Sequence, residues 1–417
     1  MPLLKLPMFR DVVSPVGRIR VPAVVVGAGV NGLGVARSLA RAGVPVWLLE
    51  SNGRCPEMYS RAATALKIES LLGETLVEEL VRLGAAQFSG LRPVLFLTQE
   101  QSVKTVSHHR DRLFPLYRFS LPLLDVVDTL LHKQGFQRLA EQFGSPIPPL
   151  VHVRTLADLP ELDNLQYPVV VKPGERHAEY AQKFKKAYFV HSAADAVELI
   201  RRILPVMSDI VVQEWIEGPD SNIYFCLQSI DRQGQVTGSF TGRKIRSWPP
   251  QVGGTASCIA APEVHGELSC MTTRFFRDAG VIGMASMEFK RDEHTREFRM
   301  VEPTIGRTDY QEEVATLNGV NLPYAAYCSE LDFPLPASAV TKGPVLWRVR
   351  SEDMQSAVAQ NQRITQGYPS GVRVTDALCR WCDPMPCLVQ GLQRVRRALH
   401  SRTSKLMPES KTARSKP

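Results

Sequence analysis

The sequence predicts an α/β protein made of several structural units. Three observations predict it: a glycine-rich strand–turn–helix–strand pattern at 24–50, helices that alternate with short apolar strands over 122–215, and two antiparallel hairpin patterns over 222–307. A chain of 417 residues holds two to four domains at roughly 100–200 residues each. Hydrophobic residues make up 44% of the chain, which is enough to bury large cores.

The charge distribution argues against a nucleic-acid-binding body. The net charge is +8, but the segment from Gly391 onward holds eight Lys and Arg residues and a single acid, Glu409. The basic excess therefore belongs to the tail, whose last dozen residues we expect to be disordered. No apolar run approaches the roughly 20 residues that span a bilayer, and residues 1–20 lack a signal-peptide core, so we expect a cytoplasmic protein.

The eight cysteines are expected to be reduced thiols, because the chain is long and shows no signal peptide. The stretch CRWCDPMPC at 379–387 contains one C-x-x-C, and only Cys387 follows it closely. A structural zinc site usually needs a second Cys or His pair. We therefore expect ordinary thiols here rather than a metal site.

The first unit, over 20–120, opens on the turn of a dinucleotide-binding fingerprint. Gly27, Gly29 and Gly32 follow the spacing G-x-G-x-x-G, and Glu50 ends the next strand, near where a ribose-binding carboxylate would lie. A helical stretch and one more strand complete the unit, and no second clear βαβ half follows. We therefore expect the glycines to serve close helix–strand packing, with an NAD or FAD oxidoreductase as the alternative.

The next part of the chain carries two lysines placed to meet a phosphate. Lys133 follows a helical run, and the apolar strand YPVVVKPG ends in Lys172, from where a lysine can point at an anion. Ser192 is the expected N-cap of the helix that follows. The strand DIVVQEWIEGPD over 209–220 offers an edge suited to an adenine base, and Asp220 is placed for a ribose hydroxyl.

A hairpin over 283–304 brings two glutamates together. Glu288 and Glu302 each lie seven residues from the turn centre near Thr295. Residues equidistant from the turn of an antiparallel pair face each other, with Cβ atoms roughly 4.5–5.5 Å apart. Two carboxylates so placed repel each other unless a cation lies between them, and Mg²⁺ commonly takes one or two carboxylates plus substrate phosphates. We expect a metal site here, the alternative being two solvated surface acids.

The order of these motifs over 121–330 resembles the ATP-grasp superfamily, and within it the ATP-dependent carboxylate–amine ligases and predicted carboligases that include D-aspartate ligase. In that family a first lysine precedes a helix and a G-x-P-x-P turn, as in HKQGFQRLAEQFGSPIPP, and a second lysine ends a strand, as in PVVVKP. The resemblance implies a role for each of these residues: nucleotide binding for Lys133, Lys172, Gln213, Glu214, Ile216 and Asp220, metal binding for Glu288, Glu302 and Thr304, and charge stabilisation for Arg243, its neighbour Lys244, and Arg307.

Two positions depart from the family pattern. The family commonly has Asn two residues after the second metal-binding Glu, and here Thr304 offers a weaker, neutral ligand. The loop after Lys172 holds one Gly, where a glycine-rich phosphate cover is usual, and Lys185 or Lys186 is placed to compensate.

The resemblance also implies a fold and an activity. It implies a Rossmann-like domain over 1–120, two ATP-grasp lobes over 121–210 and 211–332, and a C-terminal extension over 333–417. The activity would be that of a ligase which uses ATP and Mg²⁺ or Mn²⁺ to activate a small carboxylate as an acyl-phosphate and joins it to an amine or thiol. The chain would act alone or as a homodimer, without nucleic acid. A non-catalytic nucleotide-binding protein of the same fold is the second alternative.

The C-terminal segment predicts an amphipathic helix. Leu388, Leu392, Val395 and Leu399 lie on one helical face, with basic residues off that stripe. Such a helix can lie weakly on an anionic membrane surface. We expect instead that the stripe packs on the protein's own core, as in other docked terminal helices.

Overall fold

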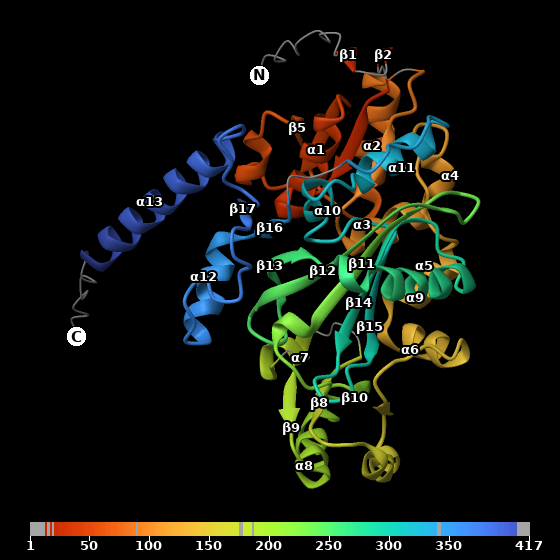
Figure 1. Ribbon diagram of the computed structural model, residues 1–417, viewed down its shortest axis with the longest axis vertical. Coiled ribbons are helices and arrows are strands. Elements are labelled where there is room, and N and C mark those ends of the chain that lie inside the picture. The colour runs from red at the N-terminus through yellow and green to blue at the C-terminus, as the bar shows by residue number, and fades with distance from the viewer. Residues whose placement is uncertain are drawn as a thin grey trace, which may run out of the picture.

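The structure is a computed structural model that describes residues 13–14, 17–18, 21–88, 90–174, 178–185, 187–339 and 343–406. Lys186 and the tail after Leu406, both of which carried predictions from the sequence, lie outside these ranges. Three larger sheets, a two-stranded sheet near the N-terminus and one long C-terminal helix organise the described chain (Figure 1).

The first unit is a four-stranded parallel sheet in the order β5-β4-β3-β6. Its strands are β3 (Ala23–Val26), β4 (Val46–Glu50), β5 (Thr64–Lys67) and β6 (Val94–Leu97), and its helices are α1 (Gly29–Arg41), the 3-10 turn η1 (Pro56–Tyr59), α2 (Gly73–Gln87), α3 (Glu100–His108) and α4 (Arg110–Leu113). A short hairpin, β1 (Val13–Ser14) with β2 (Gly17–Arg18), precedes them. Two glycines of the turn serve close packing, because a Cβ added at Gly32 would lie 2.0 Å from the Gly27 carbonyl oxygen and one added at Gly27 would lie 2.3 Å from Thr98 Oγ1, whereas Gly29 has a positive φ of 47° and open space around it.

The middle unit is a four-stranded antiparallel sheet in the order β7-β10-β8-β9. Two helices lead into it, α5 (Leu124–Leu131) and α6 (Lys133–Gln142). The remaining elements are β7 (Leu150–Val153), η2 (Leu156–Asn164), β8 (Val169–Pro173), α7 (Ala178–Lys183), β9 (Tyr188–Val190), α8 (Ala193–Ile203) and β10 (Ile210–Glu214). The predicted N-cap of α8 is confirmed, since the Ser192 hydroxyl accepts the Asp195 backbone N–H at 3.2 Å.

The largest sheet has seven strands in the order β15-β14-β11-β12-β13-β16-β17. Both predicted hairpins belong to it, and only its last pair of strands is parallel. The elements are η3 (Asp220–Asn222), β11 (Ile223–Ile230), β12 (Val236–Trp248), β13 (Gly254–Ala260), η4 (Pro262–Val264), α9 (His265–Asp278), β14 (Gly283–Arg291), β15 (Phe298–Ile305), α10 (Glu313–Leu317), α11 (Leu322–Glu330), β16 (Val345–Arg348), α12 (Arg350–Ala359) and β17 (Arg373–Asp376).

The first unit and the large sheet share one hydrophobic core, which runs from β3 and α2 to β11, α9 and β14. A polar tie joins them beside β15: the Asn31 amide of α1 donates to the Thr308 carbonyl at 2.9 Å, and the Thr308 hydroxyl donates to Asn31 Oδ1 at 2.7 Å. The middle unit has a core of its own. The loop after β15 is therefore fixed from the side of the first unit.

Two expectations for the C-terminal part are wrong. The apolar stripe of α13 (Met385–Leu406) does not pack on the core, because Leu388, Leu392 and Val395 are exposed and the helix extends away from the body (Figure 1). Cys379 and Cys387 are joined in a disulfide, so these two are not free thiols. Among the described residues, no helix combines the length and the apolar character needed to cross a membrane.

Candidate active site

A cleft of about 520 Å³ lies between the middle sheet and one face of the large sheet. Most of the residues to which the resemblance gave roles line it. From α6 and the middle sheet come Lys133, Lys172, Gln213 and Glu214, followed by Ile216, and from the large sheet come Lys244, Glu288 and Glu302. Elements far apart in the sequence therefore meet at one cleft, as predicted from motif order.

The middle sheet presents a lysine and a glutamine on the same face. Lys172 of β8 pairs in register with Val211 of β10, and Gln213 lies two residues further along β10, on the side of Val211. The Lys172 ammonium donates to Gln213 Oε1 at 2.6 Å. Lys133, the first residue of α6, lines the same cleft. The two lysines give this wall a positive charge suited to phosphate.

The large sheet presents the two glutamates on the opposite wall. Glu288 of β14 and Glu302 of β15 are register partners, which confirms the placement predicted from hairpin symmetry. The pair is less buried than the sequence suggested, because Glu302 is exposed to the cleft. Glu288 also has a cation already, since the Lys244 ammonium of β12 lies 2.7 Å from its Oε2.

Lys244 stays charged despite its burial. Burial lowers the pKa of Lys244, but the negative charge and hydrogen bond of Glu288, with help from Asp309 and Asp220, raise it further, so that the pKa stands above its usual value. The Lys244 ammonium is therefore a fixed cation next to the glutamate pair.

The donor set fits a hard divalent cation only in part. Glu288 and Glu302 supply two carboxylates from adjacent strands, which is a number that Mg²⁺ accepts when substrate phosphates complete its shell. No group of three or more His, Cys, Asp or Glu side chains with metal-binding geometry occurs in the described part of the chain. The protein's own residues thus suit a metal that arrives with a phosphate ligand.

Two residues predicted from the resemblance line neither the cleft nor the smaller cavity that adjoins it. Asp220 is buried, and its carboxylate accepts the backbone N–H groups of Ser247 and Gln251, both at 2.9 Å, so it joins η3 to β12 rather than facing a ribose. Arg243 follows the strand alternation onto the face opposite Lys244, where its register partner is Tyr224. The roles expected for these two residues, a ribose ligand and a cation near the transferred phosphoryl group, are therefore wrong.

The remaining predicted residues lie at the margin of the site. Thr304 and Arg307 line a smaller cavity of about 70 Å³ that adjoins the cleft and shares Lys133, Lys172 and Glu302 with it. Lys185 is exposed, lies over the Tyr188 ring and does not line the cleft, so it does not replace the missing glycine-rich cover.

The three-dimensional arrangement of this chain is similar to that of several solved structures. The biotin carboxylase domain of Hydrogenobacter thermophilus 2-oxoglutarate carboxylase, in complex with MgADP, ADP and bicarbonate, superposes with a TM-score of 0.60 at 15% identity over 78% of this chain and 73% of that one. N5-carboxyaminoimidazole synthetase from Staphylococcus aureus, complexed with ADP, gives 0.60 at 15% over 81% and 83%. N5-carboxyaminoimidazole ribonucleotide synthetase from Thermus thermophilus gives 0.57 at 16% over 77% and 81%.

The chain has the ATP-grasp fold. No protein-family model and no curated protein matches the sequence. The likeness thus rests on three-dimensional arrangement, which agrees with the motif order read from the sequence.

Two polar residues were missed by sequence reasoning, one that lines the cleft and one that lies behind its wall. Lys290 lies two residues after Glu288 on the same strand face and lines the cleft, where it donates to the Gly218 carbonyl at 2.7 Å and lies over the Trp215 ring. Burial lowers the pKa of Lys290 to about 8. The sequence did carry a signal for Lys290, because residues two apart in a strand lie on the same face and Lys290 is two residues after Glu288.

Asp309 is the second missed residue. It follows β15 and accepts the Ser286 hydroxyl at 2.9 Å, and Ser286 shares the strand face of Glu288. The charge of Asp309 also contributes to the raised pKa of Lys244. No periodicity in the sequence marks this acid, because it lies in an irregular loop.

In the glycine-rich turn of this chain, the acid that a dinucleotide site would use for the ribose is engaged in local hydrogen bonds. Both carboxylate oxygens of Glu50 accept hydrogen bonds from nearby backbone groups. Oε2 accepts the Ala28 N–H at 2.9 Å, and Oε1 accepts the N–H groups of Ser51 and Asn52, both at 2.9 Å. The acid that a dinucleotide site would use thus stabilises the turn itself. The geometry gives no support to the oxidoreductase alternative.

Proposed function

We propose that the protein is an ATP-dependent ligase that activates a substrate carboxylate as an acyl-phosphate and joins it to an amine. The observation that carries the proposal is the cleft with a lysine wall, Lys133 and Lys172, facing a glutamate pair, Glu288 and Glu302. The similar biotin carboxylase domain is in complex with MgADP, ADP and bicarbonate, and the similar N5-carboxyaminoimidazole synthetase with ADP, which supports nucleotide binding in the cleft here.

The middle sheet would bind the nucleotide. Lys172 and Lys133 neutralise phosphate charge, and the segment after β10, from Gln213 through Ile216, lines the cleft where a base would lie. In this arrangement the bond from Lys172 to Gln213 holds the ammonium in place before the nucleotide arrives. Positioning of this kind is what phosphoryl transfer mainly requires of a protein.

The glutamate pair would hold Mg²⁺ together with the ATP phosphates. When bound, the cation neutralises phosphate oxygens and makes the γ-phosphorus a better electrophile. Glu288 and Glu302 are its protein ligands, with Thr304 as a weak outer partner. Since Lys244 already bonds Glu288, it would share that carboxylate with the cation or turn toward the transferred group.

The reaction itself needs no protein nucleophile. A substrate carboxylate oxygen attacks the γ-phosphorus, the bond from that phosphorus to the bridging oxygen of ADP breaks, and an acyl-phosphate forms. The amine then attacks the acyl carbon, phosphate leaves, and the amine proton passes to solvent or a nearby base. Lys244, which lines the cleft, and Arg307, which lines the adjoining cavity, would stabilise the negative charge that develops.

The first unit would serve as the Rossmann-like domain that precedes the ATP-grasp lobes. Its turn is filled by Glu50, so its role would be to support the loop after β15 through the tie between Asn31 and Thr308. The lobes would meet between β10, which ends the middle sheet at Glu214, and β11, which opens the large sheet at Ile223, a few residues later than the boundary at 210 expected from the sequence.

The proposal is tested with the purified full chain. We expect Mg·ATP to bind, and ADP to be released when pools of small carboxylates and amines are added together. Glu302→Gln serves as the matched inactive control, because it removes a metal ligand that is exposed and carries no structural contact. Visible absorbance of a flavin, or binding of NAD without binding of ATP, would contradict the proposal. Tight ATP binding with no ADP release from any pool would point to a non-catalytic nucleotide-binding protein.

A further inference from the structure

The long helix α13 carries an apolar face that nothing in the described chain covers. Leu388, Leu392 and Val395 are 56%, 71% and 59% exposed, and Met385 at the start of the helix is 46% exposed. At 3.6 residues per turn, these four positions form one stripe. A solvated helix with this stripe leaves its most hydrophobic side in water.

The helix contacts the body with a side other than the stripe, on which Pro386, Gln390 and Gln393 lie. Its neighbour is η1, and the Gln393 amide donates to the Arg54 carbonyl at 2.7 Å just before that turn. Pro386 is buried, whereas Leu388 and Leu392 are exposed. A docked terminal helix normally buries its apolar side, so this arrangement is inverted. The stripe is therefore presented outward by the way the helix is attached.

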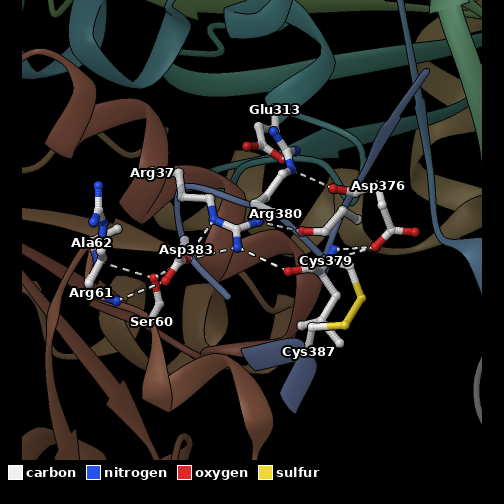
Figure 2. Close-up of polar contacts among 12 residues, drawn as sticks. Arg37, Ser60, Arg61, Ala62, Glu313, Asp376, Cys379, Arg380, Asp383 and Cys387 are labelled. Carbon is white, nitrogen blue, oxygen red and sulfur yellow. Dashed lines mark hydrogen bonds and ion pairs between the residues drawn. A yellow bond between two sulfur atoms is a disulfide. The ribbon is translucent and has the colours of Figure 1, made fainter. Parts of the chain in front are cut away.

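The attachment is a network of buried ion pairs at the base of the helix (Figure 2). Arg37 of α1 donates to Asp383 Oδ2 at 2.8 and 3.0 Å, and Asp383 also accepts the Ser60 hydroxyl at 2.6 Å. Arg380 pairs with Glu313 of α10 at 2.7 Å. These contacts fix the loop that leads into α13.

A disulfide closes the same loop. Cys379 and Cys387 are joined across the turn that contains Arg380 and Asp383, and Cys387 lies in the first turn of α13 (Figure 2). The crosslink ties the start of the helix to the ion-pair network. The base of α13 is thus held firmly while the rest of the helix extends into solvent (Figure 1).

The charge of the helix indicates what could cover the stripe. Residues 385–406 contain five Lys and Arg and no Asp or Glu, and the three arginines Arg394, Arg396 and Arg397 are exposed. Trp381, in the loop at the base of the helix, is fully exposed. An apolar stripe on a helix whose other faces carry arginines, with an exposed Trp nearby, is the pattern of helices that lie in the interface of an anionic bilayer.

We propose that α13 is a docking helix for an anionic lipid surface, which it enters with the stripe of Met385, Leu388, Leu392 and Val395 while its arginines contact the lipid headgroups. A second copy of the chain is the poorer occupant, because pairing two such helices would bring their arginines together without any acid on either helix to neutralise them. A bilayer with negative headgroups supplies both the apolar layer and the opposite charge.

The first test is sedimentation of the full chain with lipid vesicles. We expect the protein to sediment at low salt with vesicles of phosphatidylcholine and phosphatidylserine, to stay in solution with phosphatidylcholine alone, and to be released as salt rises, since headgroup attraction is screened. The apolar face is tested by the triple variant L388S/L392S/V395S. Its matched control is L123S/L156S/V358S, which removes three equally exposed apolar side chains elsewhere. We expect at least tenfold weaker vesicle binding for the first variant and none of that loss for the second.

The second test concerns the charge. Each Arg near an anionic bilayer strengthens binding about fivefold, so R394Q/R397Q is expected to bind such vesicles roughly 25-fold more weakly. Its control, R201Q/R202Q, removes two exposed arginines from α8. Thermal unfolding of all variants reports whether the fold is intact.

Three results would overturn the proposal. The intact protein could stay in the supernatant with anionic vesicles at low salt. The control variants could lose as much binding as the α13 variants. Sedimentation velocity could find a dimer that L388S/L392S/V395S dissociates, which would make the stripe an interface between two copies of the chain.

Discussion

A buried acid beside the cleft gives a sharp test of the electrostatics of the site. Glu312 follows the loop that carries Asp309; its Oε2 accepts the Asp309 N–H at 3.2 Å, and its Oε1 has no hydrogen-bond partner among the described residues. Full burial raises the pKa of Glu312 to about 8; the hydrogen bond from the Asp309 N–H lowers it, and the negative charge of Asp309 raises it. The folded protein therefore holds this carboxyl as a neutral acid at pH 7.

The sign and size of the effect on stability follow from linkage. Between the ordinary pKa of 4.5 and the folded value of about 8, the folded state binds more protons than the unfolded state at this group, so stability falls as pH rises through that window. At about 1.4 kcal/mol for each unit of pKa, the loss would reach roughly 5 kcal/mol by pH 8. Below pH 4.5 the group has no such effect.

The perturbation is Glu312→Gln, an isosteric and always neutral side chain. We expect the variant to match the wild type near pH 5 and to exceed it increasingly toward pH 8, when the free energies of unfolding are compared by urea titration at pH 5, 6.5 and 8. Glu267→Gln, an exposed change on α9, is the control and should follow the wild type at every pH. Parallel curves for wild type and Glu312→Gln would refute the reasoning.

Three further predictions test the site and its frame. Glu302→Ala should abolish ADP release and leave thermal stability unchanged, whereas Glu288→Ala should also destabilise the protein by about 3 kcal/mol, because it leaves a buried lysine unpaired; equal melting temperatures for the two variants would argue against this. Lys172→Ala should weaken Mg·ATP binding in calorimetry by tenfold or more, while Lys185→Ala, outside the cleft, should not; the reverse order would mean that the basic loop holds the phosphates. Asp383→Asn should lower the free energy of unfolding by about 3 kcal/mol, because Arg37 of α1, whose side chain is 10% exposed, would lose its counter-charge. A change under 0.5 kcal/mol in urea unfolding would show that this ion pair does not stabilise the fold.

The features that local pattern governs were predictable from the sequence. The pairing of Glu288 with Glu302 follows from hairpin symmetry, which two neighbouring strands and one turn decide. The Ser192 cap and the Lys172 strand end are likewise set by residues within one element. The motif order then led to the ATP-grasp fold without any single strong match.

The features that failed depend on how separate elements meet. Whether Arg243 or Lys244 faces the cleft is decided by the registers of β11 with both β12 and β14, and the sequence does not state either register. The Asp220 carboxylate accepts the backbone N–H of Ser247 in β12, a strand that comes later in the chain. The outward stripe of α13 depends on ion pairs with α1 and α10, so the amphipathic pattern alone could not indicate which side is buried.

The measurement that tests the central claim most directly is calorimetric titration of Mg·ATP into the full chain and into its Glu302→Gln and Lys172→Ala variants. The account predicts one binding site per chain for the wild type, binding that needs Mg²⁺, and a loss of tenfold or more in each variant, with melting temperatures unchanged in the absence of nucleotide. Binding of equal strength in all three proteins, or none in the wild type, would contradict the assignment of this cleft as the ATP site.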